Sequence, residues 1–186
     1  AHEEAHGRGR GLLVVAQPRL DADVAVATDD KRISAVVRGF GGRAVLTRPD
    51  HISGTSRIVE ALDKLGWRHR HVVNWQGDEP LTEPAHVERL LGALATNTCS
   101  PERLMWAATL ARPLTDTHDI ADPSWVKVVC RVDGSALYFS RLPIPSGIRE
   151  YLLHIGIYAY RRSFLRYVVK LPPTLAEQAE GLEQLR

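Results

Sequence analysis

Two adjacent acidic residues, Asp78 and Glu79, follow a valine-rich run and a glycine in the segment QGDEP. A carboxylate at the carboxyl end of a buried strand can hold a hard cation such as Mg²⁺ against phosphates. Because neighbouring side chains point in different directions, we expect at most one of the two acids to bind a metal. We assign that role to Asp78, directly after Gly77. The alternative is a polar turn whose acids face water.

A second polar loop, RPDHISGTSR at residues 48–57, carries a histidine and two arginines before a helical pattern. Ser53, Gly54 and Thr55 would open that helix, and the free N–H groups of a first helical turn can receive an anion or a base carbonyl. An ordinary capping loop explains these residues equally well. The shorter loop ATDD at residues 27–30 is a weaker signal, since an acid after a strand most often caps the following helix.

A third group of polar side chains occurs in the segments YFSR at 138–141 and HIGIYAY at 154–160. Along an extended segment His154, Tyr158 and Tyr160 share one face, and the isoleucines between them point to the core. An arginine that faces them, such as Arg141, would suit a bidentate grip on a substrate carboxylate. A half-buried strand without a ligand is the structural alternative.

The elements that would position these loops follow from the hydrophobic pattern. Short apolar runs at 24–27, 44–46 and 71–75 alternate with amphipathic stretches at 33–40 and 58–65, which predicts strand, helix, strand, helix, strand. Later residues predict a helix from Pro84, a strand over 105–110, a hairpin of 125–132 and 136–139 turned at Asp133-Gly134, a strand over 155–160 and a helix over 175–185. The predicted class is α/β: a Rossmann-like, mostly parallel sheet flanked by helices, with an antiparallel extension.

Composition narrows the class of protein. The 186 residues, 44% apolar and 25% charged, describe one ordinary globular domain, and a formal charge of +2 is too small for a nucleic-acid footprint. The densest basic stretch, Arg161, Arg162 and Arg166, suits the solvated face of a helix. Cys99 and Cys130 form no metal or disulfide pattern, and no apolar run approaches the ~20 residues that cross a bilayer. We predict a cytoplasmic protein that binds neither nucleic acid nor membrane.

Seven segments resemble one enzyme family in order and approximate spacing: ATDD, the 48–57 loop, QGDEP, WVKVV, ALYFSR, HIGIYAY and LEQLR. QGDEP alone is shared by sugar nucleotidyltransferases, whereas the last three are closer to 3-deoxy-manno-octulosonate cytidylyltransferase, the CMP-Kdo synthetase. The resemblance runs from about Asp23 to Arg186 and implies a nucleotide-diphospho-sugar transferase type of fold. It also implies attack by the sugar's anomeric hydroxyl on the α-phosphate of CTP, with Mg²⁺ neutralising charge and pyrophosphate leaving, to make a lipopolysaccharide precursor.

The resemblance also implies roles for individual residues. Asp78 would be the catalytic residue that binds Mg²⁺, and Gln76 would lie between the two substrates. The cytidine side would be formed by His51, Ser53, Gly54, Thr55 and Arg57. The acidic keto-sugar would be held by Arg141, His154, Tyr158, Glu183 and Gln184.

Two family segments have no match here, so we divide the chain into a poorly matched segment, 1–22, and a cytidylyltransferase domain, 23–186, that is incomplete at both ends. Family members open with a P-A-R-x-x-S-x-R-L-P-G-K-P phosphate loop, of which Gln17-Pro18-Arg19-Leu20 is a faint echo, and continue past LEQLR to D-T-P-E-D. We therefore expect feeble activity from these 186 residues alone. The alternatives are a CMP-sialic acid synthetase-like enzyme and a non-catalytic remnant. We also expect a homodimer formed through residues 125–140, with Trp125 and Tyr138 as anchors.

Overall fold

Helices and strands alternate through the first half of the chain, as the hydrophobic pattern predicts. The computed structural model describes residues 11–15, 22–79, 81–96 and 104–186. After β1 (Gly11–Val15) come β2 (Asp23–Thr28), α1 (Lys31–Gly39), β3 (Ala44–Leu46), α2 (Gly54–Leu65) and β4 (His71–Gln76). Asp30 caps α1 by accepting from the Arg32 amide, which is the structural role considered for the ATDD loop. Ser53 caps α2 in the same way, and Gly66 ends it with a φ of 66°.

The second half of the chain is rich in antiparallel strands. It contains α3 (Pro84–Thr96), β5 (Ala107–Leu114), α4 (Thr117–Ala121), β6 (Lys127–Cys130), β7 (Ala136–Ser140), β8 (Tyr151–Arg161), α5 (Arg162–Val168), α6 (Leu175–Glu180) and the 3₁₀ helix η1 (Glu183–Leu185). The predicted hairpin is confirmed as β6 and β7, and Gly134 in its turn has a φ of 82°. None of the helices in the described ranges is long and apolar enough to cross a membrane.

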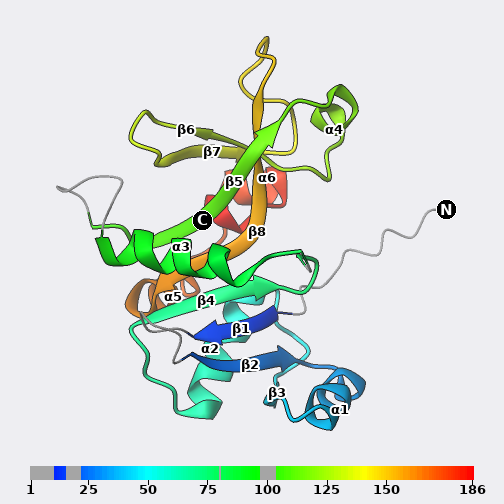
Figure 1. Cartoon of the computed structure of the whole chain (residues 1–186), viewed down its shortest axis with the longest axis vertical. Helices are drawn as coiled ribbons and strands as arrows, with labels where there is room; N and C mark the ends of the chain where they lie inside the picture. Colours follow the sequence, from blue (N-terminus) through cyan, green and yellow to red (C-terminus); the bar gives the residue numbers. More distant parts are fainter. Residues whose placement is uncertain (1–10, 16–21, 80, 97–103) are drawn as a thin grey trace.

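All eight strands form one sheet in the order β3-β2-β1-β4-β8-β6-β7, with β5 paired to β8 (Figure 1). The α/β class is confirmed, but the prediction of mostly parallel pairing is wrong in detail. β2, β3 and β4 run in one direction, as expected, yet β1 lies between β2 and β4 in the opposite direction. β8 is also antiparallel to β4, so β2 and β3 are the only parallel pair among the described strands.

Two further details differ from prediction. The sheet begins at β1, before Asp23, because GLLVV pairs with both β2 and β4. The helix predicted over 175–185 is two short helices, since Gly181 adopts a φ of 63° and ends α6. Residues 1–10 and 17–20, on which the sequence analysis also commented, and Cys99 lie outside the described residues.

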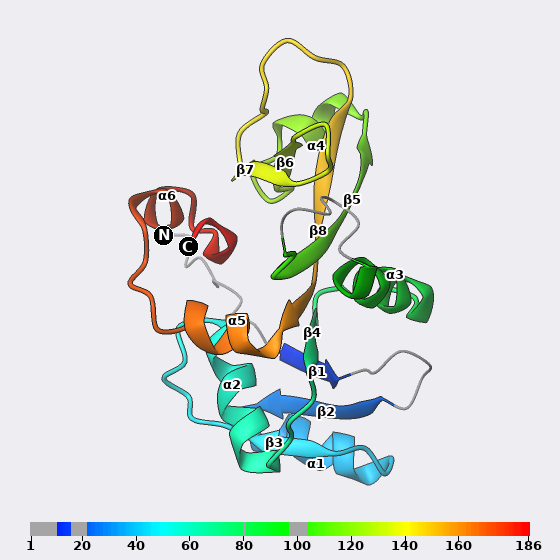
Figure 2. The same cartoon turned by 90° about the vertical axis from the view of Figure 1, so that its left-hand side faces the viewer.

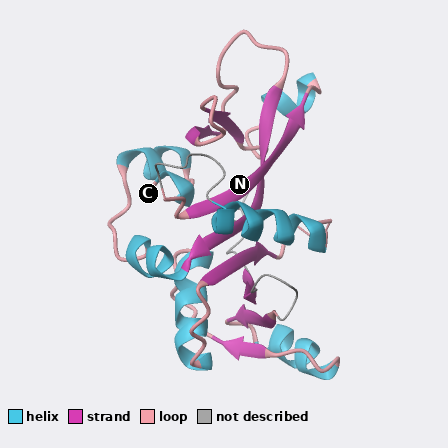
Figure 3. Ribbon diagram, turned by 60° about the vertical axis from the view of Figure 1, so that its left-hand side comes forward, coloured by secondary structure: helices cyan, strands magenta, loops and turns pink. Residues whose placement is uncertain are grey.

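Helices cover both faces of the sheet, with α2 and α5 on one side and α3 on the other (Figures 2 and 3). The core is divided accordingly. Val72 packs with Ile58 and Leu62 of α2 and with Leu165 of α5, whereas Val73 packs with the apolar stripe of α3. Because strand side chains alternate, the residues of β4 that follow Val72 on its face, Asn74 and Gln76, lie on the α2 side.

Candidate active site

Polar side chains of β4 and β8 gather on the α2 side of the sheet. We call the set the polar face: Asn74, Gln76, His154, Gly156, Tyr158 and Tyr160. Asn74 pairs with Tyr158 across the two strands, and Tyr160 packs against the α2-side core. The prediction that His154, Tyr158 and Tyr160 share one face is therefore confirmed. Asn74 was missed, because one asparagine in a valine-rich strand carries no motif of its own.

The QGDEP turn fills an interruption in the sheet. β5 pairs along one edge of β8, so β4 and β6 share the opposite edge. On that edge β4 pairs with residues 157–161 of β8, and β6 pairs with Leu153. Between them the Gly156 amide donates to Oε1 of Glu79 at 2.8 Å, and Nε1 of Trp75 donates to the Glu79 carbonyl at 2.9 Å. Glu79 therefore has a structural role, and the exposed Asp78 is the acid that remains available to a ligand.

The N-terminus of α2 meets the C-terminal helix η1 beside this face. The side chains of Ser53 and Thr55 lie near Glu183 of η1 and favour its charged form, but burial has the larger effect and raises the pKa of that carboxyl. Thr55 also lies near Tyr160, whose pKa burial raises. The neighbouring Asn74 side chain is 1% exposed, and neither its oxygen nor its nitrogen has a hydrogen-bond partner. Its nitrogen would lie 3.8 Å from a Cβ placed on Gly54.

Two residues assigned to the cytidine side make local contacts instead. His51 is hydrogen-bonded through Nδ1 to the Ser56 hydroxyl at 3.0 Å and through Nε2 to Glu60. Arg57 is 2% exposed; its Nη1 donates to the Thr47 hydroxyl at 2.6 Å and lies 3.4 Å from a carboxylate oxygen of Asp29. These bonds tie α2 to the ends of β2 and β3. Ser53 and Thr55 therefore lie beside the polar face and η1, whereas His51 and Arg57 make their bonds within the 48–57 loop, to α2 and to the strand ends.

Arg141 directly follows β7 and is held in place by two hydrogen bonds to Glu180, the last residue of α6. Its amide donates to the Glu180 carboxylate at 2.9 Å, and its Nε donates to the Glu180 carbonyl at 2.8 Å. Nη1 donates to the Pro123 carbonyl at 3.0 Å, so within the described ranges Nη2 is the guanidinium nitrogen without a partner. The fully buried Lys127 donates to the Arg141 carbonyl at 2.5 Å. Glu180 and Lys127 were missed, although WVKVV was a recognisable motif.

His154 is held by an aromatic ladder and one hydroxyl. Its ring lies 5.2 Å, centroid to centroid, from both Phe139 and Tyr158. Nε2 lies 3.0 Å from the Thr109 hydroxyl, which also lies 2.8 Å from the Ile157 carbonyl. Because that hydroxyl has a single hydrogen to donate to the carbonyl, it accepts from Nε2–H and leaves Nδ1 as an acceptor. Burial lowers the pKa of His154 to about 4, so the ring is neutral near pH 7.

The remaining predicted sugar residues lie on η1. Leu182 and Leu185 pack on Val128 and Phe139, and this contact sets Glu183 against the polar face. Gln184 is half-buried on the same helix. Arginine, neutral imidazole, phenols, amides and a buried acid therefore lie around one region of the sheet. Such groups can recognise a polyhydroxylated acid by directional hydrogen bonds together with one charged contact.

A mixed sheet with helices on both faces, and polar residues where β4 ends, define the nucleotide-diphospho-sugar transferase type of fold. The family model described as cytidylyltransferase matches residues 14–186. The chain is 43% identical to the 3-deoxy-manno-octulosonate cytidylyltransferase of Geobacter sulfurreducens, over 92% of this chain and 72% of that protein. It is 46% identical to the enzyme of the same name from Escherichia coli, over 89% of this chain and 65% of that protein.

A solved structure agrees with these relatives. The CMP:2-keto-3-deoxy-manno-octonic acid synthetase complexed with CTP superposes with a TM-score of 0.79 at 44% identity, covering 91% of this chain and 68% of that one. The chain therefore belongs to the cytidylyltransferase family, an enzyme family, and it spans about two thirds of the length of the relatives it matches.

Proposed function

We propose that the protein transfers CMP from CTP to 3-deoxy-manno-octulosonate and releases pyrophosphate, as a step toward a lipopolysaccharide precursor. The observation that carries this proposal is the gathering of His154, Tyr158 and Glu183 on one face near the N-terminus of α2, with Arg141 at the end of β7. The relatives of the chain at 43% and 46% identity carry that activity in their names. The reaction depends on positioning and electrostatics, because little covalent chemistry is required of the protein.

Each substrate has its own set of groups in this proposal. The sugar carboxylate is received by Arg141 and its hydroxyls by Nδ1 of His154, by Tyr158 and by η1. The nucleotide is received by Ser53, Gly54, Thr55 and the unpartnered amide of Asn74. Gln76 lies between the two groups at the end of β4. The local bonds of His51 and Arg57 give these residues a supporting role, in which they hold the 48–57 loop in shape.

The family implies Mg²⁺, and the residues present fit a cation that is shared with nucleotide phosphates. Within the described ranges no three His, Cys, Asp or Glu side chains converge to hold a metal by themselves. The exposed carboxylate of Asp78 would supply one ligand, and Mg²⁺ usually binds through one or two carboxylates plus substrate phosphates. When bound, the ion would neutralise charge on those phosphates.

Replacing Asp78 with asparagine tests this assignment. We expect Asp78→Asn to keep the fold and to abolish the Mg²⁺ dependence of CTP binding in calorimetric titrations. Glu79→Gln is the matched control, since glutamine can still accept from the Gly156 amide. A larger loss of Mg²⁺ dependence in Glu79→Gln than in Asp78→Asn would move the metal role to Glu79.

Substrate choice is tested by titrating the chain, in the presence of CTP and Mg²⁺, with 3-deoxy-manno-octulosonate and separately with sialic acid. We expect saturable heat with the octulosonate and binding at least about tenfold weaker with sialic acid, the difference that ~1.4 kcal/mol of selective contacts produces. Preference for sialic acid would support the CMP-sialic acid synthetase alternative. Binding of neither sugar would support the non-catalytic remnant.

We further infer that the protein forms a homodimer. We also infer that it is located in the cytoplasm, where CTP is available.

A further inference from the structure

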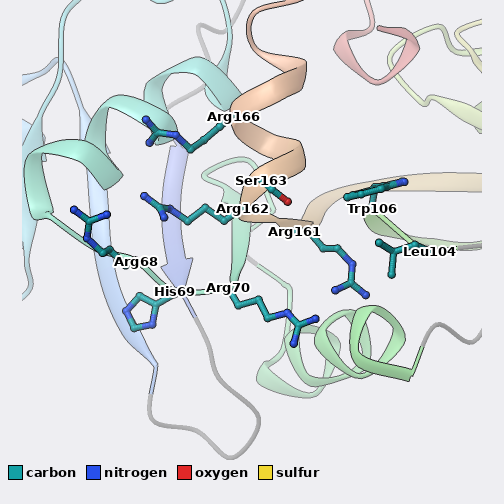
Figure 4. Close-up of a pocket in the computed structure, with 9 residues that line it drawn as sticks. All are labelled: Arg68, His69, Arg70, Leu104, Trp106, Arg161, Arg162, Ser163 and Arg166. Carbon is teal, nitrogen blue, oxygen red and sulfur yellow. The ribbon is translucent and has the colours of Figure 1, made fainter.

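A pocket of about 380 Å³ lies where β4 begins and β8 ends, at the end of β4 opposite to Gln76 and the QGDEP turn (Figure 4). Its walls are formed by Arg68, His69, Arg70, Leu104, Trp106, Arg161, Arg162, Ser163 and Arg166. β4 separates this pocket from the Gln76 end of the polar face, and the five steps of ~3.3 Å from His71 to Gln76 place the two roughly 17 Å apart. The pocket is therefore not part of the site already described.

The positive charge of this pocket is poorly compensated. Arg166 is paired with Asp63 at 2.5 Å, and His69 is hydrogen-bonded to Asp23 at 2.9 Å. Arg161 donates to the carbonyls of Met105 and Leu94, and no acid among the described residues is paired with it.

Three more arginines, Arg68, Arg70 and Arg162, have no ion pair with any acid in the part of the chain that the structure describes. The Nε of Arg162 is buried and has no hydrogen-bond partner. Arginines that gather without acids repel one another, and a bound anion would relieve that repulsion.

A neighbouring histidine is affected by the same charge. His71 pairs with Arg161 across β4 and β8, is buried, and has no partner for its Nε2. Burial lowers the pKa of His71, and the charges of Arg161 and Arg70 lower it further. An uncharged histidine beside these arginines adds no positive charge of its own. It also does nothing to neutralise theirs.

The pocket also has an apolar wall. Trp106 is 47% exposed and lies 6.1 Å from the ring of Phe164, and Leu104 lies beside it among the lining residues. Figure 4 shows Trp106 and Leu104 on one side of the group and Arg68, Arg162 and Arg166 on the other. A planar guanidinium group can donate two parallel hydrogen bonds to the oxygens of a phosphate. An exposed indole can cover the uncharged part of the same ligand.

We propose that this pocket is a second ligand site, which binds a phosphate-bearing compound through the unpaired guanidinium groups of Arg70 and Arg162 with Trp106 against its uncharged part. The backbones of the two arginines are adjacent, because the Arg162 amide donates to the Arg70 carbonyl at 2.9 Å, and Figure 4 shows their guanidinium groups extending from there to opposite sides of the pocket. The phosphate can belong to a free metabolite or to a phospholipid headgroup. This site stands independently of the reaction proposed above, since it shares no residue with the polar face.

The test follows the indole N–H resonance of Trp106, assigned with Trp106→Phe, while inorganic phosphate replaces chloride at constant ionic strength. We expect a saturable shift whose dissociation constant rises at least tenfold in the double variant Arg70→Gln/Arg162→Gln. These side chains donate no hydrogen bond within the described ranges, so the variant should keep its melting temperature. Arg89→Gln/Arg149→Gln, which removes two exposed arginines elsewhere, should match the parent. A shift that does not saturate, or equal weakening in the control, would overturn the proposal.

Sedimentation with vesicles identifies the source of the phosphate. Co-sedimentation with phosphatidylglycerol vesicles but not with phosphatidylcholine vesicles, lost in Arg70→Gln/Arg162→Gln, assigns the site to an anionic headgroup. Saturable phosphate binding without co-sedimentation assigns it to a free phosphorylated compound. The absence of both would remove the pocket as a ligand site.

Discussion

At the scale of single residues, the proposed sugar recognition rests on Arg141, whose Nη2 has no partner among the described residues while the Glu180 and Pro123 carbonyls fix the orientation of the guanidinium. We expect Arg141→Ala to weaken octulosonate binding by roughly 2 to 4 kcal/mol and to leave CTP binding nearly unchanged. Titration calorimetry with each substrate measures both. Arg149→Ala, an exposed arginine on the adjoining loop, is the control. Loss of CTP affinity without loss of sugar affinity would show that Arg141 serves the nucleotide.

His154 makes the folded state sensitive to mild acid. Burial lowers its pKa from 6.5 to about 4, so the unfolded chain takes up this proton more readily than the folded one. The stabilisation from the neutral ring is complete above about pH 6.5 and is lost as pH falls toward 4, by on the order of 3 kcal/mol. Glu183, whose pKa burial raises, opposes this trend because the folded state binds its proton more readily.

Comparison of the parent with His154→Gln separates the two groups. Urea unfolding at pH 7.5 and pH 5 should show a smaller loss of unfolding free energy in the variant, which has no ring to protonate. An identical loss in both proteins would mean that His154 is not responsible.

At the scale of elements, Gly156 controls how the QGDEP turn seats against β8. A Cβ at this position would lie 3.1 Å from Oε1 of Gln76 and 3.2 Å from Oε1 of Glu79. We expect Gly156→Ala to displace both side chains and to weaken binding of CTP with Mg²⁺ by roughly tenfold, about 1.4 kcal/mol. Gly92→Ala on α3 is the control, since nothing lies within 4 Å of its Cβ and alanine favours a helix by about 0.5–1 kcal/mol. Unchanged affinity in Gly156→Ala would show that the turn tolerates the shift.

The elements that sequence reasoning found are those with strong local signals. β2, α1, β3, α2 and β4 follow from periodicity and caps, and the β6–β7 hairpin follows from Asp133-Gly134. β1 was missed because its five residues have no flanking signal and one of its two partner strands, β4, lies far along the chain. The Gly181 break was missed because a glycine is tolerated inside a helical pattern until its φ is known.

The candidate site could be predicted only in part, for a related reason. Tyr158 and His154 share a face because a strand alternates, which is visible in one sequence. Glu79 bound to Gly156, Glu180 bound to Arg141, and Glu183 placed near Ser53 are pairs brought together by tertiary structure. Nothing in the local pattern of either partner indicates such a pair. His51 and Arg57 were assigned by family position, and their local hydrogen bonds emerged only in the fold.

At the scale of the whole molecule, the β6–β7 hairpin is the surface on which we place the dimer contact. Leu137 is 51% exposed there, and Tyr138 is also exposed. Trp125, expected as an anchor, packs instead with Leu114, Tyr151 and Leu153 and lies under Arg112. Light scattering should give twice the 20.7 kDa chain mass, and Leu137→Glu should shift the population to monomer. Lys170→Glu, an exposed change elsewhere, should leave it unchanged. A monomeric parent at micromolar concentration would contradict the proposal.

β8 has a further consequence for the molecule, because one strand of eleven residues is hydrogen-bonded to three others. β5 follows it from Tyr151 to Tyr160, β4 pairs with its last five residues, and β6 joins at Leu153. β8 therefore pairs with strands at both the hairpin end and the α2 end of the molecule (Figure 1). Neither end can unfold without disturbing this strand. Local opening in one half must break bonds that also order the other half. The chain should accordingly behave as one cooperative unit in unfolding, although its two ends carry separate small cores.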